Sequence, residues 1–166
     1  MGSRIMGQFG TILKEAWSKT LPVAKFLCFL HVTGTYGCQV SHSYGPSMLP
    51  TLGSTNYLIY ETISTRCDNI RPGDIVIVRS VENPRKYTTK RLIGMEGDTV
   101  TYLVDPKESD KCETVVIPKG HIWVQGDNIY DSNDSRKFGP VPYGLLIGKA
   151  FWKIWPPEGF GSLGKN

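Results

Sequence analysis

Ser47 is the first residue whose surroundings could support chemistry. The run from Tyr44 to Thr51 reads YGPSMLPT, so a Gly-Pro corner precedes the serine and a second proline follows it. Glycine and proline favour turns, and the Ser47 hydroxyl is therefore expected at a fixed turn or strand end. A serine hydroxyl becomes a nucleophile only when a base takes its proton. By itself such a run is more typical of an ordinary loop serine, so the catalytic interpretation needs a base elsewhere in the chain.

Lys90 is the candidate base. It precedes Arg91 in a run of strand-forming residues, and successive strand residues point to opposite faces, so Lys90 faces inward if Arg91 faces water. Burial lowers the pKa of a lysine amine because it disfavours the charged form. A neutral amine near pH 7 requires the pKa to fall by roughly three pH units, at a cost of about 4 kcal/mol. Lys86 is the competing base, in a Pro-Arg-Lys segment that is expected to face solvent.

A third block, residues 126–142, concentrates turn formers, carboxylates and one arginine. Such a block can hydrogen-bond itself into a rigid loop through Asx turns and an Asp–Arg pair. As part of a site, Ser132 would orient the lysine amine, and Asp134 with Arg136 would brace the loop. A polar surface loop is the alternative interpretation.

The composition excludes several classes of function. The net charge of +4 comes without a dense run of Lys and Arg, so no nucleic-acid partner is expected. The four cysteines and three histidines show no metal-ligand spacing, and no dinucleotide or phosphate-loop motif is present, so no cofactor is expected. The cysteines, far apart in the chain, are predicted to be free or buried thiols, with a disulfide as the alternative.

The first forty residues form a segment of their own. Residues 1–25 are basic, hydroxylated and amphipathic, which is typical of an organelle-targeting segment or of an interfacial helix. Residues 21–40 are apolar but interrupted by Lys25, His31 and two glycines, so they would span a bilayer only weakly or lie in its interface. The predicted organisation is a targeting and membrane-associated segment over 1–40, a main domain over 41–155 and an irregular tail over 156–166.

The main domain is predicted to be mostly β. Short runs rich in β-branched and aromatic residues alternate with Gly, Pro, Asn and Asp, and none has helical periodicity. This pattern predicts an antiparallel all-β domain of curled sheets. The predicted strands are 57–60, 74–79, 88–93, 99–104, 114–117, 121–124 and 146–154.

The ordered combination of residues 45–51, 71–76, 90–98 and 126–139 resembles the type I signal peptidase family of Ser/Lys endopeptidases. The resemblance implies that family's curled antiparallel fold, with Ser47 as nucleophile and Lys90 as general base. It also implies that Ser132 holds the amine while Asp134 and Arg136 brace the site. Gly45 departs from many bacterial members, which have a serine hydroxyl there to help bind the oxyanion. The oxyanion would then depend on backbone N–H groups, chiefly that of Ser47.

Within that family, the small size and the GPSM and SNDSR sequences are most similar to the mitochondrial inner membrane members. This similarity implies a protease of the inner membrane whose catalytic domain faces the intermembrane space. Its partners would be precursor proteins with cleavable presequences, the membrane and a sister catalytic subunit in a heterodimer. Two alternatives stay open: a self-cleaving Ser/Lys protease of the repressor type, and a non-catalytic β scaffold subunit of a membrane complex.

Overall fold

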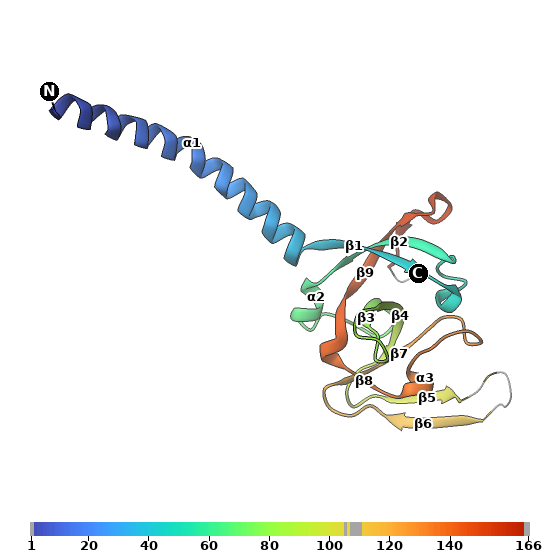
Figure 1. Cartoon of the computed structure of the whole chain (residues 1–166). Helices are drawn as coiled ribbons and strands as arrows, with labels where there is room; N and C mark the ends of the chain where they lie inside the picture. Colours follow the sequence, from blue (N-terminus) through green and yellow to red (C-terminus); the bar gives the residue numbers. More distant parts are fainter. Residues whose placement is uncertain (1, 105, 107–110, 165–166) are drawn as a thin grey trace. The chain divides into compact units, whose positions relative to one another are not determined.

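The chain divides into two compact units, residues 1–37 and 38–166. The structure is a computed structural model that describes residues 2–104, 106 and 111–164. The first unit is the helix drawn in blue in Figure 1, and the second contains all the strands.

Helix α1 (Gly2–Tyr36) makes up nearly all of the first unit, with Pro22 inside it. Its hydroxyl side chains bond back to the preceding turn, as Thr20 does to the Ala16 carbonyl at 2.7 Å, which is how hydroxyls are accommodated inside helices. Side chains 14–35 are exposed. A helical N-terminal segment was predicted and is confirmed. None of the helices in the described part of the chain combines the length and the apolarity needed to cross a membrane.

The second unit is built on a sheet of eight strands in the order β1-β2-β9-β3-β4-β7-β8, with β10 paired to β9. All of its pairs are antiparallel, and β5 and β6 form a separate antiparallel pair. The strands are β1 (Cys38–Tyr44), β2 (Thr55–Glu61), β3 (Ile75–Arg79), β4 (Tyr87–Gly94), β5 (Thr99–Leu103), β6 (Cys112–Val116), β7 (His121–Gln125), β8 (Val141–Pro142), β9 (Leu146–Trp155) and β10 (Gly161–Ser162). Short helices lie between them: η1 (Pro46–Met48), α2 (Ile63–Arg66), α3 (Ser135–Phe138), η2 (Tyr143–Leu145) and η3 (Pro157–Gly159).

Strand β3 is buried on both faces, which explains its uninterrupted apolar sequence. Its residues alternate between two cores. Val76 and Val78 pack with residues of β4 and β7, whereas Ile75 and Ile77 pack with Met48, Leu52 and residues of β2 and β9. Each fully buried aliphatic side chain contributes about 1.5–3 kcal/mol. The second core therefore anchors the segment that follows Ser47.

The mostly β, antiparallel prediction is confirmed, and every predicted strand overlaps an observed one. Strand β1 was not predicted, and residues 38–40, assigned from the sequence to the N-terminal segment, are its first residues. The tail is less irregular than predicted, because η3 and β10 form within it and Leu163 N donates to Phe151 O at 2.8 Å. Cys28, Cys38 and Cys67 are free thiols, but they are exposed rather than buried.

Candidate active site

Ser47 lies on η1, at the turn that follows β1. Gly45 opens this turn at φ +115°, a conformation that residues with a Cβ rarely adopt. Pro46 occupies the first helical position, where its missing N–H costs nothing. The Ser47 carbonyl accepts a 3.0 Å bond from Asn128 N, and Asn128 Nδ2 donates to Pro46 O at 3.2 Å. Residues 126–128 therefore hold the half-buried Ser47 in place.

Gly126 is the point at which the Ser47 turn and Ser132 meet. A Cβ added at Gly126 would lie 2.3 Å from Ser132 Oγ and 2.4 Å from Ser47 O. Neither distance is compatible with a side chain, so the close approach of the two serines depends on glycine at this position.

Lys90 projects from β4 into the interior, as predicted, and only 4% of the residue is exposed. Its Nζ donates a 3.0 Å hydrogen bond to Ser132 Oγ. Burial lowers the pKa of Lys90 to about 8, against the opposing charge of Asp134. This fall is smaller than the one needed for a mostly neutral amine at pH 7. At that pH roughly a tenth of the molecules carry the neutral amine.

Asp134 braces the loop that carries Ser132. Its side chain is fully buried and accepts from Arg136 Nε at 2.9 Å, Arg136 Nη2 at 2.6 Å and Gly126 N at 2.8 Å. It also caps the N-terminus of α3, and the Ser132 hydroxyl helps to stabilise its charged form. Burial alone raises the pKa of the Asp134 carboxyl, but these hydrogen bonds together hold that pKa below its ordinary value. The pairing predicted between Asp134 and Arg136 is present.

Ser47 and Lys90 line the same cavity, which has a volume of about 500 Å³. Asp131 and Asn133, on either side of Ser132, also line it. The structure thus brings all five predicted site residues to one region of the second unit. Lys86, the competing base, lines the cavity too, but it is exposed where Lys90 is buried.

Arg91 has a role that the sequence did not reveal. Its side chain is mostly buried, and its guanidinium donates to Asp127 Oδ1 at 2.7 Å, Asp127 Oδ2 at 2.6 Å and Gly73 O at 2.8 Å. A longer bond of 3.4 Å reaches Thr51 Oγ1. The strand of Lys90 is thereby tied to the turns on both sides of the site. The Gly-Asp-Asn run at 126–128 was the available signal for these partners.

Comparison with known proteins identifies the family of the chain. The family model described as signal peptidase, peptidase S26 matches residues 15–106 and 103–155. The chain belongs to the peptidase S26 family.

Individual relatives of this family member are similar over most of their length. Subunit 1a of the mitochondrial ATP-independent inner membrane protease of Arabidopsis thaliana is 52% identical over 151 residues, 90% of each chain. Mitochondrial inner membrane protease subunit 1 of Homo sapiens is 41% identical over 82% of this chain and 81% of the relative. Subunit 2 of the Saccharomyces cerevisiae protease is 35% identical over 80% of this chain and 72% of the relative.

Proposed function

We propose that this peptidase S26 protein is a serine endopeptidase that uses Ser47 as nucleophile and Lys90 as general base. The observation that carries the proposal is the buried Lys90, which lines the same cavity as Ser47 and whose amine has a lowered pKa. Proteins keep a lysine in such a place mainly where chemistry needs a neutral amine.

In the first half of the reaction, neutral Lys90 removes the proton from Ser47 Oγ, and that oxygen attacks the peptide carbonyl carbon. The resulting oxyanion is held by backbone N–H groups, chiefly that of Ser47, because Gly45 supplies no hydroxyl. The fixed turn at η1 keeps this N–H and the nucleophile in one rigid piece.

In the second half, the protonated Lys90 gives its proton to the departing amine, which leaves the acyl group on Ser47. Neutral Lys90 then removes a proton from a water molecule that attacks the ester carbonyl. The bond from the carbonyl carbon to Ser47 Oγ breaks, Lys90 returns its proton to Ser47 Oγ, and the carboxyl product departs. Ser132 positions Lys90, and Asp134 with Arg136 positions Ser132. These three residues act through Lys90.

The substrates would be extended N-terminal presequence segments. Within the described chain β1 pairs on one side only, with β2, and it leads directly into the Ser47 turn. A segment that adds to the free edge of β1 would present its carbonyl close to Ser47. Small side chains near the cut would fit shallow pockets beside Ser47.

The relatives support a location and a partner. Because they are named as mitochondrial inner membrane proteases, we assign this chain to that membrane, with its catalytic unit facing the intermembrane space. The substrates would be precursors sorted to that space. Since relatives named subunit 1 and subunit 2 both match, the assignment includes a sister subunit as partner.

The test compares four forms of the full chain on a precursor protein in membranes: unchanged, Ser47→Ala, Lys90→Met and Lys86→Met. Cleavage should be lost in the first two variants and kept in Lys86→Met, which removes the other lysine of the same cavity. A serine-directed acylating inhibitor should label Ser47 in the unchanged protein, as read by mass spectrometry. Normal cleavage by Ser47→Ala or Lys90→Met would contradict the proposal. Precursor binding without turnover in the unchanged protein would favour a scaffold.

A further inference from the structure

A second polar cavity lies on the other side of β4 from Lys90. Its volume is about 440 Å³, and its lining includes Thr51, Arg91, Lys153 and Ser162. Arg91 follows Lys90 on β4, and neighbouring strand residues point to opposite faces. The cavity therefore shares Arg91 with the candidate site but is lined neither by Ser47 nor by Lys90.

Lys153 is the unusual residue of this cavity. Only 8% of the residue is exposed. No hydrogen bond or ion pair joins its ammonium to any residue that the structure describes. Its Nζ packs over the backbone of Gly159, where an added Cβ would lie 2.3 Å away. Lys153 Nζ is not among the fully buried atoms that lack a partner, so it keeps some contact with the cavity. An ammonium with little access to water and no partner in the described chain can bind an anion that enters the cavity.

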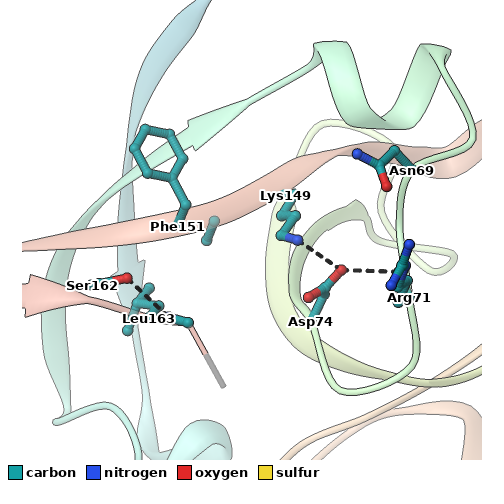
Figure 2. Close-up of a pocket in the computed structure, with 9 residues that line it drawn as sticks. Asn69, Arg71, Asp74, Lys149, Phe151, Ser162 and Leu163 are labelled. Atoms are coloured by element: carbon teal, nitrogen blue, oxygen red, sulfur yellow. Dashed lines mark hydrogen bonds and ion pairs between the residues drawn. The ribbon is translucent and has the colours of Figure 1, made fainter. Parts of the chain in front are cut away.

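In a neighbouring cavity, another lysine of the same strand is paired with an acidic side chain. It lies beyond tail residues 162–164, which line both cavities. There Lys149 pairs with Asp74 Oδ2 at 3.0 Å, and the same oxygen accepts from the backbone N–H of Arg71 at 2.9 Å (Figure 2). Lys149 and Lys153 both lie on β9, but only Lys149 has an acid beside it. The positive charge that no acidic side chain of the described chain balances is therefore that of Lys153.

The rest of the lining fits an oxyanion. The charge of Arg91 is already balanced by Asp127, so Lys153 supplies the attraction. Thr51 and Ser162 offer hydroxyl groups. Three glycines in the lining have no side chain between their backbone and the cavity. Several donors of this kind around one cation match the oxygens of a phosphate group.

We propose that the cavity at Lys153 binds a phosphate group, carried either by free phosphate or by the headgroup of an anionic lipid. The site is separate from the proposed peptidase chemistry and does not depend on it. Its occupant would contact Arg91 and Thr51, which also face Asp127 beside the Ser47 turn.

The test measures protection of Lys153 in the full-length protein. Acetic anhydride modifies accessible lysines, and mass spectrometry follows the acetylation rates of Lys153 and of the exposed Lys119. The first arm adds inorganic phosphate and compares it with chloride at equal ionic strength. The second arm uses protein reconstituted in vesicles of phosphatidylcholine with phosphatidylglycerol, compared with phosphatidylcholine alone. Acetylation of Lys153 should slow severalfold while that of Lys119 stays unchanged.

The two arms distinguish the sources. Protection by inorganic phosphate identifies a site for free phosphate, and protection by phosphatidylglycerol vesicles alone identifies a headgroup site. Protection by neither overturns the proposal. If inorganic phosphate gives no protection, equal protection by both kinds of vesicle overturns it as well.

Two variants add a matched comparison. Lys153→Met should weaken the binding of the effective anion by about tenfold or more, because a charge-assisted hydrogen bond is lost. Binding is read from the rise in melting temperature with anion concentration. Lys149→Met, in the same strand but beside Asp74, should keep the full response. An equal loss in both variants would contradict the assignment to this cavity. None of these readouts depends on cleavage.

Discussion

Ser132 Oγ accepts a 3.0 Å hydrogen bond from Lys90 Nζ, and the Ser132 hydroxyl also helps to lower the pKa of the Asp134 carboxyl. A Ser132 hydrogen that points toward the Asp134 carboxylate leaves the lone pair of a neutral Lys90 amine unoccupied. In the proposed mechanism, that lone pair accepts the Ser47 proton. The loop therefore orients the amine without competing for its basic electron pair.

The pH dependence of cleavage should follow the Lys90 amine. With a pKa lowered by burial to about 8, the active neutral form increases as pH rises through that value. We expect kcat/KM to rise about tenfold between about pH 7 and pH 9 and then to level off. The Lys86→Met variant should show the same profile. A rate that is flat across this range would contradict the role of Lys90 as base.

Lys90→Met should make the protein more stable at neutral pH. In the unfolded chain the amine has its ordinary pKa of 10.5, and folding lowers that pKa to about 8. Below about pH 8 both states are charged and the folded state bears the whole burial cost, about 3 kcal/mol. The cost fades as pH rises from about 8 to 10.5 because the folded state releases its proton first.

The variant lacks this cost but also loses the hydrogen bond to Ser132, worth about 1 kcal/mol. Urea unfolding should therefore show a gain of about 2 kcal/mol in the free energy of unfolding at pH 7, shrinking by pH 10. Lys119→Met, at an exposed position, serves as the control. A loss of stability in Lys90→Met at pH 7 would show that burial of the charged Lys90 amine does not destabilise the folded protein.

The ion pair between Arg91 and Asp127 should be energetically coupled. The cycle of Arg91→Met, Asp127→Asn and the double variant should give a coupling energy of about 1–3 kcal/mol, because both side chains are largely buried and joined by two hydrogen bonds. The exposed pair of Lys111 and Glu113 is the control, with coupling below about 1 kcal/mol.

Kinetic measurements distinguish an effect of the Arg91–Asp127 pair on catalysis from an effect on folding stability alone. Each single variant should lower kcat more than it raises KM, because Asp127 adjoins Asn128, which holds the Ser47 carbonyl. A fall in stability with unchanged kcat would limit the pair to a structural role.

Gly126→Ala should disrupt the site by crowding. The new methyl group would force apart Ser132 Oγ and Ser47 O, at a cost of about 1–3 kcal/mol in stability and with most of the activity lost. Gly144→Ala is the matched control, because nothing lies within 4 Å of a Cβ added there. Activity close to normal in the Gly126→Ala variant would mean that the two serines need not be held so closely.

The local parts of the site were predictable from the sequence, and the distant contacts were not. Asp134 and Arg136 are two residues apart, so composition alone suggested their pairing. The Arg91–Asp127 bond joins residues 36 positions apart, and the bond from Asn128 to Pro46 spans 82. No periodicity marks such contacts, because they depend on how the sheet curls. The extent to which Lys90 is buried, and hence its pKa, depends on the same curvature.

Strand β1 escaped prediction for a different reason. Its sequence, CQVSHSY, alternates exposed and half-buried positions with no fully buried one. It also follows an apolar helix without a strong break, so its first residues resembled the end of that helix. An edge strand with weak burial gives little hydrophobic pattern to detect.

Strand β9 lies between β2 and β3, and it alone joins the β1-β2 side of the sheet, which leads to Ser47, to the β3-β4 side, which carries Lys90. Loss of β9 would leave every proposed catalytic residue in the chain but would divide the sheet into two parts. Ser47 would then follow the edge of one part while Lys90 lay in the other.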